Sequence, residues 1–186
     1  AAVTQRAMNG ELDFAAALRE RVALLAGLPS TAIAAVIRDR LTLMPGARTL
    51  VATMRKHGAR AALVSGGFTA FTRHVQQLCG FDLEEANELE IADGRLTGAL
   101  RGELRGASAK LQALGRLQVE LGLLPAQTMA VGDGANDLPM LQAAGLGVAF
   151  RAHPRVRAAA AARVDHGDLT ALLFLQGYAR SEFVAD

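Results

Sequence analysis

The stretch Gly132-Asp133-Gly134-Ala135-Asn136-Asp137-Leu138-Pro139-Met140 combines two acids, an amide and two glycines. It follows an apolar run at residues 128–131 that predicts a short strand, and it leads into a helix predicted for residues 136–144 with Pro139 in its first turn. At such a strand-to-helix corner, helix N–H groups bind phosphate, and glycines let the backbone approach the ligand closely. The stretch therefore predicts an α/β fold with a phosphate site at this corner.

Asp133 lies at the mouth of the predicted strand. A carboxylate there suits a hard cation such as Mg²⁺, which binds oxygen ligands and usually bridges to phosphate. The purely structural alternative is that Asn136 caps the helix and Asp137 interacts favourably with the helix dipole. Because capping leaves Asp133 without a role, the sequence favours a metal and phosphate site.

Length and composition limit the class of protein. The chain has 186 residues, enough for one domain with a sizeable core or one domain with a small insertion. No apolar run reaches the length of a membrane span and the first residues lack a signal-peptide pattern, so we expect a cytoplasmic protein. Cys79 is the single cysteine, which excludes an internal disulfide. The net charge of +2 comes from interspersed charges, which is not typical of nucleic-acid-binding proteins.

The pattern of elements divides the chain near Pro45. Residues 1–44 show only helical patterns and are predicted to form a small helical cap, incomplete at its N-terminus. In residues 45–186 strands and helices alternate, which predicts a Rossmann-like α/β core with a parallel sheet and helices on both faces. An Asp-Gly pair at 93–94 predicts a β-hairpin over about residues 87–100, expected as a flap beside the sheet rather than part of it.

A second motif, Ser65-Gly66-Gly67-Phe68, ends a strand predicted for residues 60–64 and precedes a helix. A hydroxyl and two glycines at the carboxyl end of a parallel strand form a second phosphate-binding corner. Two such corners are expected to share one ligand. For this motif alone, the alternative is a glycine turn with Ser65 as a local cap.

Two cations occupy positions that local structure does not explain. Lys110, one of only two lysines, opens a predicted helix, where an ammonium group opposes the helix dipole. Contact with a phosphate would account for it, and a solvated surface lysine is the alternative. Arg21 falls on the apolar stripe of a predicted helix, where a guanidinium is costly without an anion. It either reaches solvent or an acidic partner, or it clamps a small carboxylate.

These motifs, taken in their order along the chain, resemble the phosphoserine phosphatases of the haloacid dehalogenase (HAD) superfamily. The resemblance covers nearly the whole chain, including Met8-Asn9-Gly10, residues 14–22 and His166-Gly167-Asp168-Leu169. It implies Mg²⁺-dependent hydrolysis of O-phospho-L-serine to serine and phosphate through an aspartyl-phosphate, the last step of serine biosynthesis. It implies neither nucleic acid nor membrane as a partner, and it leaves a homodimer open.

The resemblance also implies roles for matching positions. Substrate and phosphate would be bound by Met8, Phe14 and Arg21 in the cap and by Ser65, Gly66, Lys110 and Asn136 in the core. Lys110 would neutralise the phosphate and the transition state, and Asp137 would orient Lys110. Asp133 would hold Mg²⁺.

One part of the superfamily pattern does not occur in these 186 residues. This is the Asp-x-Asp-x-Thr/Ser motif, which in the superfamily supplies the nucleophile and the general acid/base. There it ends the middle strand, between the strands that here end at Ser65 and at Asp133. We therefore expect the sequence to be a fragment that is inactive alone, with no strand ladder between residues 60–64 and 128–131.

Two other functions stay open. The first is a HAD phosphatase of another small phosphomonoester, in which Arg21 would bind a different anion. The second is a catalytically dead module that binds phosphate or a phosphorylated partner.

Overall fold

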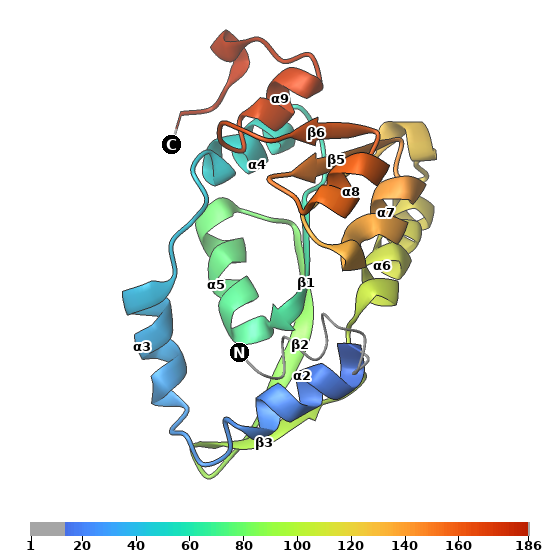
Figure 1. Ribbon diagram of the computed structural model, residues 1–186. Coiled ribbons are helices and arrows are strands. Elements are labelled where there is room, and N and C mark those ends of the chain that lie inside the picture. The colour runs from blue at the N-terminus through green and yellow to red at the C-terminus, as the bar shows by residue number, and fades with distance from the viewer. Residues whose placement is uncertain (1–13, 186) are drawn as a thin grey trace.

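The computed structural model describes residues 14–185 (Figure 1). The α-helices are α2 (Phe14–Ala23), α3 (Thr31–Arg40), α4 (Ala47–Lys56), α5 (Thr69–Cys79), α6 (Ala107–Leu121), α7 (Leu138–Ala143), α8 (Pro154–Ala159) and α9 (Ala171–Leu175). The strands are β1 (Ala62–Phe68), β2 (Leu83–Ala92), β3 (Arg95–Arg101), β4 (Met129–Gly132), β5 (Leu146–Phe150) and β6 (Ala162–Val164). Short 3₁₀ helices are η1 (Pro125–Gln127), η2 (Ala135–Asp137) and η3 (Arg180–Glu182). Within this range, no helix combines the length and apolar character required to cross a bilayer.

The strands of the described range form two three-stranded sheets, in the orders β1-β2-β3 and β4-β5-β6. β1 pairs with β2 in parallel, and both pairs of the second sheet are parallel, whereas β2 and β3 are antiparallel. The fold is therefore the predicted α/β type with parallel sheets and flanking helices.

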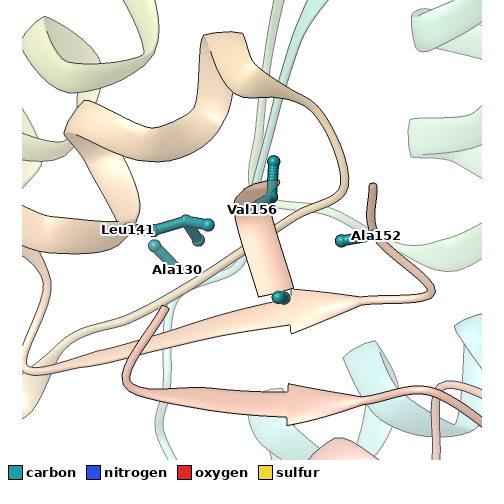
Figure 2. Packing of buried hydrophobic residues seen from close by; sticks show 5 residues of the cluster. Ala130, Leu141, Ala152 and Val156 are labelled. Atoms are coloured by element: carbon teal, nitrogen blue, oxygen red, sulfur yellow. The ribbon is translucent and has the colours of Figure 1, made fainter. Parts of the chain in front are cut away.

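Helices cover both faces of the second sheet. Side chains of a strand alternate between its faces, so Val148 packs with residues of α4 and α9, while Ala149 packs toward α7 and α8. Figure 2 shows the second of these faces, where Ala130, Leu141 and Val156 gather between the strands and the helices. This packing fixes the end of β4, from which the first phosphate-binding corner leaves.

α6 connects the first sheet to that corner. α5 and α6 both pack against β1, and α5 also covers β2. α6 contacts α7 and η2 as well, and these are the elements that follow β4. The helix that carries Lys110 therefore lies against β1 and against the corner after β4.

β1 and β4 each have one neighbouring strand within residues 14–185, and no ladder joins them, as predicted. The burial of their residues reflects this. Leu63 and Val64 of β1 are only half-buried, whereas Val148 and Ala149 of β5, which has neighbours on both sides, are 0% exposed. Among residues 14–185, β1 and β4 thus each keep one edge without a partner strand.

The hairpin is present, but the expectation that it stands beside the sheet is wrong for its first strand. β2 begins at Leu83, and its first half pairs with β1 through Leu83, Glu84 and Glu85. Only the second half, from Glu88 on, forms the ladder with β3. Adjacent acids weaken a strand pattern in the sequence, and here arginines from other elements neutralise them.

The helical cap rests on this hairpin. Leu18 and Val22 of α2 are buried against Leu89 and Leu96, and Phe68 at the end of β1 packs on the same cluster. Figure 1 shows α2 lying across β2 and β3, near the end of the molecule at which α6 begins. The cap therefore lies beside the carboxyl end of β1, where the Ser65 motif is.

A turn in the C-terminal segment is hydrogen-bonded to the residues that precede α4. The Asp168 carboxylate accepts hydrogen bonds from Thr170 Oγ1 (2.5 Å) and Thr170 N–H (2.8 Å), just before α9 begins at Ala171. The neighbouring Leu169 N–H donates to the carbonyl of Pro45. The hydroxyl bond of Thr170, then its N–H bond, lowers the pKa of Asp168 below the ordinary value of 3.8.

This shift gives a pH-dependent stability. A carboxyl whose pKa is lower in the folded state stabilises the fold above its unfolded pKa, and this stabilisation is lost as the pH falls through the folded pKa. Wild type should exceed Asp168→Asn by about 1 kcal/mol in unfolding free energy near neutral pH. The difference should shrink below pH 3.8. Urea unfolding across the acid range measures it, and a difference that grows toward low pH would contradict the assignment.

Candidate active site

Asp137 is the buried centre of the corner after β4. Its side chain is 3% exposed. One carboxylate oxygen, Oδ2, accepts hydrogen bonds from the N–H groups of Asp133 (3.1 Å) and Gly134 (3.0 Å). These bonds fold the Gly132–Asp137 turn around the carboxylate and hold the chain in a fixed path.

Two glycines make room for this turn. A Cβ on Gly132 would lie 2.4 Å from the Cβ of Asp137, and a Cβ on Gly134 would lie 2.4 Å from Oδ1 of Asn136. Real Cβ atoms do not approach other heavy atoms so closely. Gly132 faces the Cβ and Cγ of buried Asp137 and so requires glycine for reasons of space, whereas at Gly134 only the end of the Asn136 side chain would have to move. The pattern that suggested a phosphate loop is therefore also explained by close packing of two polar side chains on the backbone.

Lys110 pairs with the second oxygen of the same carboxylate. Its Nζ donates to Oδ1 of Asp137, and its side chain is only 12% exposed. Lys110 is the fourth residue of α6, since the helix begins at Ala107 and not at Lys110 itself. The buried carboxylate thus meets three donors, and the ammonium group keeps further N–H donors that are not used in the described part of the chain.

Ser65 and Asn136 also keep unused donors. Ser65 Oγ accepts a hydrogen bond from Gly67 N–H at 3.0 Å, and no described residue accepts its hydroxyl proton. The side-chain amide of half-buried Asn136 has no hydrogen-bond partner among residues 14–185. A hydroxyl, an amide and an ammonium with free donors form a suitable set for an oxyanion.

Asp133 is the exposed carboxylate of the corner. Its backbone carbonyl accepts from His153 N–H (3.1 Å), while its carboxylate makes no ion pair within the described range. No group of three or more His, Cys, Asp or Glu side chains in residues 14–185 is arranged to hold a metal. Mg²⁺ needs fewer protein ligands, because it often takes one or two carboxylates and completes its shell with water and phosphate oxygens. Asp133 fits this kind of site.

Of the three predicted cap residues, the structure describes the side chain of Arg21 alone. Met8 and the side chain of Phe14 lie outside the described residues. Arg21 is exposed, and the prediction that it sits within the apolar stripe is wrong, because the buried face of α2 is formed by Ala17, Leu18 and Val22. Its guanidinium makes no ion pair with any residue of the described range.

The predicted site residues differ in how closely the structure brings them together. Lys110 and Asp137 are in direct contact although they are 27 positions apart. Asp133 and Asn136 share their turn. Ser65 lies on β1, against which the helix of Lys110, α6, packs.

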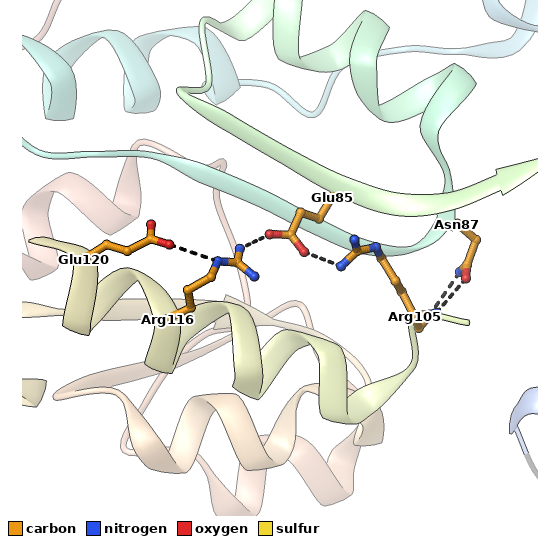
Figure 3. A network of polar contacts seen from close by, with 5 residues as sticks. All are labelled: Glu85, Asn87, Arg105, Arg116 and Glu120. Carbon is orange, nitrogen blue, oxygen red and sulfur yellow. Dashed lines mark hydrogen bonds and ion pairs between the residues drawn. The ribbon is translucent and has the colours of Figure 1, made fainter. Parts of the chain in front are cut away.

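The sequence patterns missed a polar network between β2 and the start of α6 (Figure 3). Glu85, 9% exposed, pairs with the guanidinium groups of Arg105 and Arg116. Asn87, two residues further on the same face of β2 and 2% exposed, bonds to the backbone of Arg105 and of the Ser65 motif. An asparagine inside a strand is unusual. The presence of Asn87 in a strand-like stretch was therefore the one local signal that could have identified this polar network.

Known proteins resemble this chain in sequence and in fold. A phosphoserine phosphatase of Streptomyces coelicolor is 49% identical over 185 residues, covering 100% of this chain and 45% of the relative. The unliganded structure of a probable phosphoserine phosphatase from Vibrio cholerae has a TM-score of 0.89 at 41% identity, covering 97% of this chain and 55% of that one. A substrate-bound phosphoserine phosphatase complex has a TM-score of 0.85 at 37% identity, covering 93% and 82%.

The chain spans about half the length of the first two of these proteins. The family model described as haloacid dehalogenase-like hydrolase matches residues 3–142, which include the Ser65 motif, Lys110 and the Gly132–Asp137 turn. The chain therefore belongs to the haloacid dehalogenase-like hydrolase family.

Proposed function

We propose that the intact protein hydrolyses O-phospho-L-serine to serine and phosphate. The observation that carries the proposal is Lys110, a cation only 12% exposed and held by a buried carboxylate at the end of β4. A positive charge fixed in a protected place favours an anionic ligand and the charge that develops on it in a transition state. Similarity to phosphoserine phosphatases across the whole chain supports this choice of reaction.

Each residue of the site has a part in this chemistry. Ser65 donates its hydroxyl proton to a phosphate oxygen, Lys110 neutralises the phosphoryl charge, and Asn136 donates to a phosphoryl oxygen or to the attacking water. Asp137 holds Lys110 in place through the ion pair. Arg21 in the cap takes the carboxylate of phosphoserine, since a guanidinium can bind a carboxylate with two parallel hydrogen bonds.

The nucleophile and the general acid/base are aspartates of an Asp-x-Asp-x-Thr/Ser segment that these 186 residues do not contain. The open edges of β1 and β4 support this part of the proposal. A parallel strand pairing with both would join the two sheets and place its carboxyl end next to the ends of β1 and β4, because parallel strands end at the same edge of a sheet. The aspartyl-phosphate forms on that strand, and the 186 residues alone are inactive.

Magnesium is the proposed cofactor, and enzymes of this family are generally metal-dependent. Asp133 would hold it together with the phosphate oxygens and the missing aspartates. Bound there, the cation would supply charge neutralisation of the phosphoryl group. Lys110 supplies a second positive charge.

Phosphate release by the intact protein from phosphoserine tests this function, and Arg21→Ala tests its specificity. Arg21 would contact a part of the substrate that does not react, so its loss should raise KM for phosphoserine by about tenfold or more with a smaller change in kcat. Arg19→Ala is the matched control, because Arg19 is exposed on the same helix. It should leave KM unchanged.

The same assay separates the rival functions. Hydrolysis of phosphoserine with a KM that does not respond to Arg21→Ala would favour a phosphatase of another small phosphomonoester. Phosphate binding by the intact protein without hydrolysis of any phosphomonoester would favour a catalytically dead module.

A further inference from the structure

Asn87 lies where the β1–β2 ladder is interrupted. The ladder pairs Val64 with Glu85 and resumes at Phe68 with Asn87, so residues 65–67 of β1 stand opposite Ala86 alone. The chain at the Ser65 motif therefore bulges away from β2, and the bulged carbonyls lose their partners in the ladder.

The side chain of Asn87 forms hydrogen bonds with these carbonyls in place of the ladder. Its Nδ2 donates to the carbonyls of Gly66 (3.0 Å) and Gly67 (3.3 Å). It also lies 3.1 Å from the carbonyl of Arg105, and its Oδ1 accepts from Arg105 N–H at 2.7 Å. An amide of this size offers two N–H donors, one of them shared between two of these three carbonyls, together with an acceptor for an N–H.

These bonds join the two halves of the proposed site. Gly66 and Gly67 belong to the proposed phosphate-binding motif at the end of β1, and Arg105 lies two residues before α6, which carries Lys110. Figure 3 shows Asn87 contacting Arg105, whose guanidinium is in turn held by Glu85 of the same strand. Asn87 is 2% exposed, so solvent cannot replace its bonds.

We propose that Asn87 is a positioning residue for phosphate binding, which fixes the distance between the Ser65–Gly67 backbone and the start of the Lys110 helix. The inference rests on the proposed function, because it assumes that these two elements bind the same phosphate. Asn87 touches no reacting atom, and it acts through the backbone of both elements.

Asn87→Asp tests the proposal with little change in shape. A carboxylate can still accept from Arg105 N–H, but it places negative charge against three carbonyl oxygens and donates to none of them. Titration calorimetry of the intact protein with inorganic phosphate should show binding weakened by about tenfold or more. The weakening relative to wild type should diminish as the pH falls, because a protonated carboxyl can donate again.

Thr53→Val is the control for general destabilisation. Thr53 of α4 is 0% exposed, and its Oγ1 accepts a hydrogen bond from Val184 N–H at 2.9 Å. Its replacement removes a buried bond outside the site, so it should lower stability without changing phosphate affinity. Asn87→Ser is the second variant, to be measured if Asn87→Asp does not fold. Its side chain is smaller and keeps a hydroxyl donor, and it should also bind phosphate more weakly than wild type.

The outcomes separate this inference from the function itself. Wild-type phosphate affinity in the Asn87 variants, or an equal loss in Thr53→Val, would overturn the role of Asn87 and leave the phosphatase proposal intact. An intact protein that binds phosphate but does not hydrolyse phosphoserine would refute the function, while weakened binding in Asn87→Asp would still support the inference. An intact protein that binds no phosphate would overturn both.

Discussion

Lys110→Met is expected to lower kcat of the intact protein for phosphoserine by about a thousandfold. The loss follows from removing a fixed positive charge whose stabilising effect is greatest on the phosphoryl group in the transition state. Lys110 is only 12% exposed, so water does not screen this charge as it would on the surface. Steady-state kinetics with phosphoserine measure the effect. A decrease of less than about tenfold would contradict a role for Lys110 in the chemistry.

Two further variants separate the loss of the Lys110 charge from the general loss of a lysine and from a loss of stability. Lys56→Met is the matched control, because Lys56 is the only other lysine and is exposed at the end of α4. It should leave kcat unchanged. Lys110→Met also leaves the carboxylate of Asp137 buried without its ion pair, which should cost roughly 3 kcal/mol of stability. Adding Asp137→Asn removes that buried charge, so the double variant should regain stability but not activity.

Gly132→Ala is expected to be the most disruptive small substitution in the site. Its Cβ would lie 2.4 Å from the Cβ and 2.5 Å from the Cγ of Asp137, and neither the strand end nor the buried side chain can move without breaking other bonds. We expect a loss of about 3 kcal/mol in unfolding free energy and a large loss of activity, because Lys110 loses the partner that positions it. Chemical denaturation together with the phosphoserine assay measures both.

Gly115→Ala provides the contrast. A Cβ on Gly115, in the middle of α6, would meet no atom within 4 Å. Alanine is favoured over glycine inside a helix, so this variant should be more stable by about 0.5 to 1 kcal/mol. If Gly132→Ala were as well tolerated as Gly115→Ala, the close packing of Asp137 on the turn would be refuted.

The sequence was sufficient for features that depend on neighbouring residues. Strands were predicted at residues 60–64 and 128–131, close to β1 and β4, because a short apolar run ending in glycines and polar residues identifies a strand followed by a helix. β1 runs further than predicted, through the Ser65 motif to Phe68. The lack of a ladder between β1 and β4 was also predicted, but that expectation came from the superfamily resemblance and not from the local pattern.

Features that depend on distant partners were missed. The first half of β2 carries Glu84 and Glu85, whose arginine partners, Arg105 and Arg116 among them, lie on other elements, so a local pattern does not show that these acids are neutralised. Arg21 was assigned to the buried stripe because residues 14, 18, 21 and 25 are also at helical spacing. The structure places Leu18 and Val22 on the hairpin and leaves Arg21 exposed, and only the position of the hairpin decides between these two faces.

We propose that Ser65, Lys110 and Asn136 bind a single oxyanion. A crystal structure of the intact protein soaked with tungstate, an analogue of phosphate, tests it most directly. We expect one tungstate with Ser65 Oγ, Lys110 Nζ and the Asn136 amide all within hydrogen-bonding distance of its oxygens. Tungstate bound elsewhere on the protein, or bound by one of these three side chains while the others face away from it, would show that the three residues do not form one oxyanion site.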